Sequence, residues 1–131
     1  MSPDGKIFAA RLQQLRRTAI QLRRHVVEAV HHAGAGHLGG PLSAAEILTA
    51  LYFEVMNIDP ETPRDPDRDR FILSKGHCSI GLYAVLAQRG YFPEAELMTF
   101  DAIDSRLQGH PDMAVLPGLD MSTGSLGQGL S

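Results

Sequence analysis

One amphipathic pattern covers the start of this chain and constrains its fold more than any other feature. From residue 6 to about residue 32, apolar side chains recur at steps of three and four, which predicts one long helix with an apolar face. The members of this stripe are Phe8, Leu12, Leu15, Ala19, Leu22, Val26 and Val30. A helix with such a face needs a partner surface, either within the chain or on another polypeptide.

Charge and composition exclude several classes of protein. The chain has 131 residues and a formal net charge of -3, so nucleic acid and membrane surfaces are not expected partners. Arginines on the polar sides of the long helix therefore indicate a solvated or subunit-facing surface. No apolar run is long enough to span a bilayer, and the N-terminus lacks the apolar core of a signal peptide. The single cysteine, Cys78, cannot form an internal disulfide, which favours a cytoplasmic location.

Glycine and histidine occur together at three places. His37, His77 and His110 each follow a glycine directly, and the chain closes with a glycine-rich stretch, residues 122–131. Glycine permits positive φ and a close approach of the backbone to a ligand, so these segments are candidate binding loops. Because they are far apart in sequence, only tertiary folding can bring them together.

The other elements predict an α/β fold that is rich in helix. A capping box at 43–46 places a second helix from Ala44 to near Asn57, and further helices are expected at 78–89 and 93–100. Residues 58–70 form a charged, proline-rich loop, and residues 101–121 are mostly irregular. The apolar run 71–73 is predicted to be the first strand of a parallel sheet, so that His77 lies at a strand-to-helix junction, where such sheets bind ligands.

Two other chemistries are compatible with these residue types. A zinc site would need ligands drawn from His32, His37, His77, Cys78 and His110, but no tightly spaced ligand pair is present. As a nucleophile, Cys78 would lie beside a helix N-terminus, which lowers the pKa of a thiol. As a buried packing residue, it needs no lowered pKa.

The glycine–histidine segments, in their order, resemble the N-terminal part of transketolase. The matching stretches are residues 33–48, 67–77, 105–111 and 122–129, and the resemblance covers about residues 10–131. It implies a chain, 1–131, that forms the N-terminal part of the diphosphate-binding domain of a parallel-sheet fold. It also implies transfer of a two-carbon ketol unit from a ketose phosphate to an aldose phosphate with thiamine diphosphate as cofactor.

The resemblance assigns roles to six residues of this chain. His77 is expected to contact the cofactor diphosphate, and His37 and His110 to face the reacting carbon, bind the hydroxyls of the donor and take part in proton transfer. The residues expected to line the aminopyrimidine and thiazolium rings of the cofactor are Gly124, Ser125 and Leu126.

The chain departs from the family pattern in two ways. Leu38 stands where proline is common, and leucine or isoleucine there is typical of transketolases split into two polypeptides. The family's metal motif is absent up to Ser131, so ligands for Mg²⁺ or Ca²⁺ are expected outside this chain. We therefore expect a homo- or hetero-oligomer in which a complementary polypeptide supplies the rest of this domain and the pyrimidine domain. The alternatives are a non-catalytic binding or assembly module or an inactive fragment and, less favoured, another thiamine-diphosphate enzyme such as dihydroxyacetone synthase.

Overall fold

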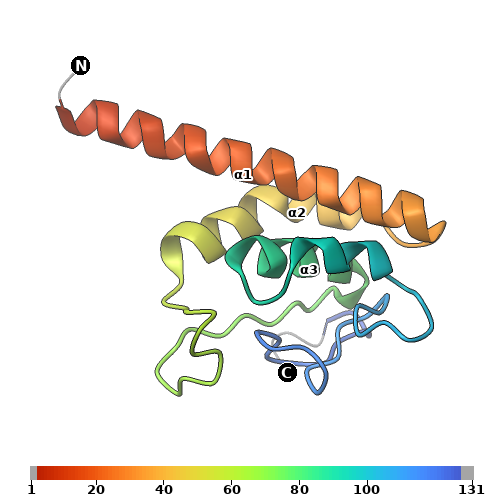
Figure 1. The fold of residues 1–131 in the computed structure, drawn as a ribbon. Helices are drawn as coiled ribbons and strands as arrows, with labels where there is room; N and C mark the ends of the chain where they lie inside the picture. Colours follow the sequence, from red (N-terminus) through yellow and green to blue (C-terminus); the bar gives the residue numbers. More distant parts are fainter. Residues whose placement is uncertain (1–2, 128–131) are drawn as a thin grey trace.

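The computed structural model describes residues 3–127 and contains three α-helices, shown in Figure 1. Helix α1 (Pro3–Ala33) lies across α2 (Gly39–Ala50) and α3 (Ser79–Arg89), and the loops of the second half of the chain lie on the other side of α3 (Figure 1). Three short helical segments complete the fold: a π-helical turn η1 (Leu51–Val55) and the 3₁₀ segments η2 (Gly76–Cys78) and η3 (Glu94–Thr99). No helix among the described residues is long and apolar enough to cross a membrane.

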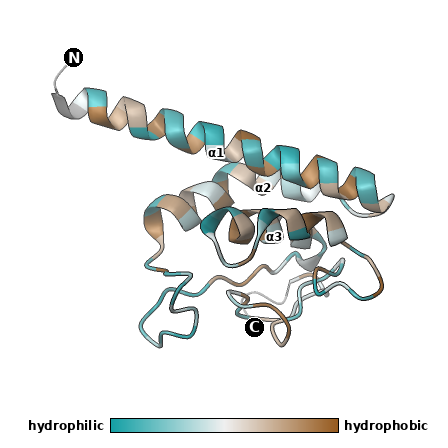
Figure 2. Ribbon diagram, viewed as in Figure 1, coloured by the Kyte–Doolittle hydropathy of each residue, from teal (hydrophilic) through white to brown (hydrophobic). Residues whose placement is uncertain are grey.

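Helix α1 confirms the long helix predicted from the apolar stripe, but the chain buries only part of that stripe. Leu22 and Val26 are fully buried against α2 and α3, whereas Phe8 is 70% exposed. The N-terminal half of α1 extends beyond the other two helices (Figure 1), and apolar and polar residues alternate along it (Figure 2). The first turns of this half therefore leave large apolar side chains exposed, Ile7 at 69% and Phe8 at 70%, and Leu12 is exposed at 37%.

Helix α2 begins five residues earlier than the predicted start at Ala44. The capping box is wrong, because Ser43 already lies within the helix and its hydroxyl donates to the carbonyl of Gly40 at 2.8 Å. The carboxylate of Glu46 instead accepts two hydrogen bonds from the guanidinium of Arg23, at 2.6 Å each. Pro41 fits the first turn of α2, where a backbone N–H has no partner within the helix.

The predicted strand at 71–73 is not present, and the described residues contain no strand. The N–H of Phe71 donates to a carboxylate oxygen of Asp120 at 2.7 Å, and Leu73 is buried in the core. A strand requires a second strand beside it to complete its ladder of hydrogen bonds. No other segment of residues 3–127 forms such a ladder with this one, so the described part of the chain is helical rather than α/β.

Helix α3 confirms the helix predicted at 78–89 and forms the centre of the core. Its residues from 79 to 87 are all buried, and Gly90 ends it in the left-handed conformation with φ of 95°. The segment predicted as a helix at 93–100 is a 3₁₀ helix, and Pro93 precedes it in an extended conformation instead of occupying its first position.

Candidate functional site

The structure brings the first two glycine–histidine segments into contact. His37 lies in the loop between α1 and α2, and His77 lies in η2 immediately before α3. Their ring centroids are 5.2 Å apart, with the rings edge to face at 62°. Gly36 makes this loop possible, because its φ is 122° and a Cβ there would lie 2.9 Å from the ring of Phe100.

The glycine-rich stretch packs directly on the His77 segment. A methyl group placed on Gly76 would lie 2.7 Å from three backbone atoms of Thr123 and Gly124. The two backbones can approach so closely only because residue 76 has no side chain. Gly124 in turn faces His110, since a methyl group on it would lie 3.5 Å from Cδ2 of that imidazole.

Four of the six predicted residues, His37, His77, His110 and Gly124, thus belong to one continuous set of contacts. Neighbouring pairs run from His37 to His77, from Gly76 to Gly124, and from Gly124 to His110. A hollow of about 450 Å³ is lined by residues 121–125 of the glycine-rich stretch, which include Ser125. Leu126 is 67% exposed next to it. The last residues of the stretch, 128–131, lie outside the described part of the chain.

The surroundings of Cys78 do not favour a nucleophilic role. Its side chain is fully buried, and burial raises the pKa of its thiol, an effect that the charge of Lys75 offsets in part. A methyl group on Gly40 would overlap its sulfur, so the thiol fills the space between α2 and η2. The raised pKa is opposite to the lowered value that the nucleophile hypothesis requires, and Cys78 has the packing role.

The zinc hypothesis has no ligand set in the part of the chain that the structure describes. Among residues 3–127, no three side chains of histidine, cysteine, aspartate or glutamate come close enough together to hold a metal ion. His32 lies in the last turn of α1, whereas His37 lies beyond the two glycines that end this helix.

Two hydroxyl groups of α3 bind the backbone beside His110, and they were not predicted from the sequence as site residues. Ser79 donates to the carbonyl of Gly109 at 2.8 Å, and Tyr83 donates to that of Gln108 at 2.9 Å. Their spacing of four residues places both hydroxyls on one face of the predicted helix. The sequence does not show what they bind, because their partners are distant in sequence. Thr123 was also missed as a site residue: its hydroxyl is buried and has no hydrogen-bond partner among the described residues.

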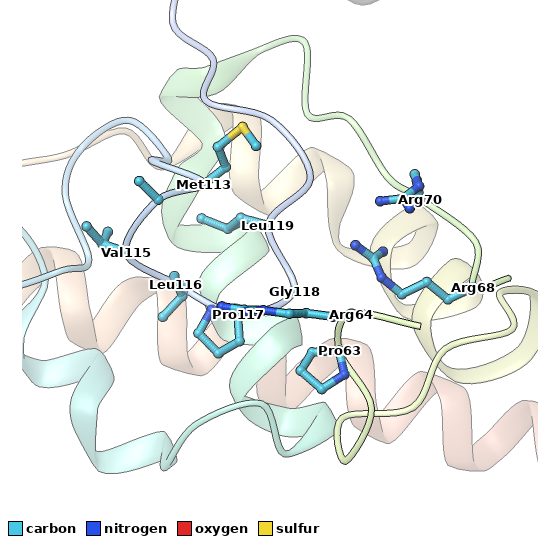
Figure 3. Close-up of a pocket in the computed structure, with 11 residues that line it drawn as sticks. Pro63, Arg64, Arg68, Arg70, Met113, Val115, Leu116, Pro117, Gly118 and Leu119 are labelled. Carbon is cyan, nitrogen blue, oxygen red and sulfur yellow. The ribbon is translucent and has the colours of Figure 1, made fainter. Parts of the chain in front are cut away.

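A second cavity lies away from these histidines. It has a volume of about 540 Å³ and contains none of the predicted site residues (Figure 3). Three arginines, Arg64, Arg68 and Arg70, face a loop of mainly apolar residues at 113–119 across it. Arg68 and Asp120 form a buried ion pair beside it, and Arg70 lies 3.7 Å from the same carboxylate. This arrangement ties residues 68–71 to the segment that leads into the glycine-rich stretch.

Comparison with known families gives a direct match to most of the chain. The family described as "Transketolase, thiamine diphosphate binding domain" matches residues 15–131. The chain belongs to the transketolase family. It is 49% identical over 117 residues to the 6-deoxy-6-sulfo-D-fructose transketolase subunit SqwG of Clostridium sp. (strain MSTE9), covering 89% of this chain and 42% of that protein. It is 46% identical over 109 residues to an apulose-4-phosphate transketolase subunit from Phocaeicola vulgatus, covering 83% of this chain and 38% of that protein.

Longer transketolases match as well. The human transketolase is 47% identical over 120 residues, which cover 92% of this chain and 19% of that protein. Among solved structures, the transketolase from Leishmania mexicana superposes with a TM-score of 0.84 at 36% identity, covering 88% of this chain and 17% of that one. This chain therefore spans about two fifths of the two transketolase subunits and about one fifth of the human transketolase.

Proposed function

We propose that this chain supplies part of the cofactor and donor site of a transketolase that moves a two-carbon ketol unit from a ketose phosphate to an aldose phosphate. The observation that carries the proposal is the set of contacts joining His37, His77, Gly124 and His110 at the glycine-rich stretch. Family membership supports the choice of thiamine diphosphate as cofactor.

The residues at this place fit a diphosphate group. The buried hydroxyl of Thr123 lacks a partner and is available as a donor. Imidazoles donate to phosphate oxygens, and His77 lies beside Gly40, where a Cβ would come within 3.5 Å of its Nε2. When bound, thiamine diphosphate supplies the carbon nucleophile and electron sink for cleavage of the donor.

The chain's own residues then have distinct tasks. His77 binds the diphosphate, while Gly124, Ser125 and Leu126 line the rings of the cofactor. His37 and His110 bind donor hydroxyls and take part in proton transfer there.

The roles proposed for His77 and His110 predict different changes in cofactor KM and kcat when each histidine is replaced by alanine. With the complementary polypeptide present, His77→Ala should raise the cofactor KM about 10-fold with a small change in kcat, because it removes a binding contact. His110→Ala should lower kcat about 100-fold with little change in the cofactor KM, because it removes a group that moves protons. Steady-state kinetics at varied thiamine diphosphate measures both. His32→Ala, at an exposed position on α1, is the matched control. Wild-type kinetics for both variants would contradict the assignment.

We further propose that the exposed apolar face of α1 binds the complementary polypeptide. Ile7 and Phe8 are 69% and 70% exposed, and Leu12 lies on the same stripe. Two relatives are named as transketolase subunits, which supports a partner chain. Side chains of this size contribute most to binding when a partner buries them.

The proposed interface predicts a defect in association. Replacing both Phe8 and Leu12 by aspartate should weaken binding of the complementary polypeptide by about 10-fold or more, because the change puts charge into an apolar contact. Calorimetric titration of one polypeptide into the other measures this, with Gln13→Asp on the same helix as control. Equal affinities for the two variants would rule out this face. Normal association without cofactor binding would favour the assembly-module alternative.

A further inference from the structure

We propose that Ser79 and Tyr83 of α3 are positioning residues that set the place of the His110 imidazole. The inference rests on the proposed function, because it takes His110 as the group that faces the donor. It concerns two hydroxyl groups that lie beneath the site and do not line its glycine-rich wall.

The two hydroxyls serve three consecutive carbonyl groups. Ser79 donates to Gly109 at 2.8 Å; Tyr83 donates to Gln108 at 2.9 Å and lies 3.3 Å from the carbonyl oxygen of His110. Both side chains are fully buried, so no water replaces these bonds if they are lost. The backbone that carries the His110 imidazole is therefore held from one side by α3.

Tyr83 is suited to act as a permanent donor. Burial raises the pKa of its phenol, and the nearby hydroxyl of Ser79 lowers it to a smaller extent. The hydroxyl therefore keeps its proton throughout the neutral range. Its ring packs against Phe100 with centroids 6.4 Å apart, which helps to hold the phenol oxygen in place.

The opposite side of the same loop is tied to the glycine-rich stretch. The N–H of Thr123 donates to the carbonyl of Pro111 at 3.3 Å, and Gly124 faces the ring of His110. Because α3 begins two residues after His77, one rigid helix sets the spacing between His77 and His110. A shift of about 1 Å in a reacting group can lower a rate about 100-fold, so this spacing affects catalysis.

A double-mutant cycle separates positioning from general stability. In the enzyme formed with the complementary polypeptide, Tyr83→Phe should lower kcat about 10-fold, because it removes the hydroxyl and keeps the ring. In the His110→Ala background the same change should lower kcat no further, since Tyr83 acts through the residue already removed. The cofactor KM should stay within about twofold of the wild-type value. Tyr52→Phe is the control, because Tyr52 is also buried but packs its ring on Phe71, away from this loop.

An equal loss of kcat in both backgrounds would overturn the proposal and leave Tyr83 a merely structural residue. The ring resonances of His110 give a second readout, in the 131-residue chain itself and without activity. Tyr83→Phe and Ser79→Ala should shift them, and Tyr52→Phe should not; unchanged resonances in both site variants would also overturn the proposal. If His110→Ala keeps full activity while these shifts occur, the assigned role of His110 fails and the positioning effect stands.

Discussion

Gly76→Ala is expected to destabilise the chain by about 3 kcal/mol and to abolish tight cofactor binding. The added methyl group would lie 2.7 Å from the N atom of Gly124 and from the carbonyl C and O atoms of Thr123. All three are backbone atoms, so the overlap cannot be relieved by rotating a side chain. Overpacking of this kind typically costs about 1–3 kcal/mol, and we expect a value at the upper end of this range for residue 76. Relief requires the glycine-rich stretch to move off the His77 segment, which opens the proposed site. Denaturant unfolding followed by circular dichroism measures the loss.

The control for this prediction is another glycine of the same chain. Gly39 begins α2, and a methyl group there meets no atom within 4 Å. Gly39→Ala should therefore be neutral or slightly stabilising, because alanine loses less backbone entropy than glycine in a helix. If Gly76→Ala is as stable as Gly39→Ala, the close contact between the two segments is not present in solution.

Asp120→Ala is expected to cost about 3–5 kcal/mol of unfolding free energy. The side chain of Asp120 is 4% exposed and that of its partner Arg68 is 10% exposed, so the ion pair is buried. Removing the carboxylate leaves the guanidinium of Arg68 buried without its counter-charge, which is strongly destabilising. It also removes the acceptor of the Phe71 N–H. Chemical denaturation measures this change too.

An exposed ion pair provides the comparison. Arg11 and Glu54 are each 46% exposed, and breaking their contact with Glu54→Ala should cost less than about 1 kcal/mol. Asp120→Asn keeps an oxygen that accepts from Phe71 but loses the charge, and its cost should lie between those of the two alanine variants. A cost for Asp120→Ala no larger than that for Glu54→Ala would show that Arg68 finds another partner or water.

Local sequence patterns predicted a helix correctly where an apolar face or a helix-breaking glycine is enough to define it. The stripe from Phe8 to Val30 marks α1, and Gly90 marks the end of α3. The same reasoning failed at α2 and at residues 71–73. Glu46 pairs with Arg23 instead of capping its own helix, and Phe71 donates to Asp120 instead of to a strand. At Glu46 a partner distant in sequence replaced the local capping bond, and at Phe71 a side-chain carboxylate took the place of a second strand.

The residue types of the site could be read from the amino-acid sequence: the three histidines that follow glycines, and the glycine-rich stretch. Their order also carried the resemblance that the family match confirmed. Their contacts came from tertiary folding, which places His37 against His77, packs Gly76 on Gly124, and brings hydroxyls of α3 to the loop of His110. The reason is physical: glycine permits a close approach but does not specify what approaches, and the buried donors of a helix find their acceptors only when the loops fold onto it.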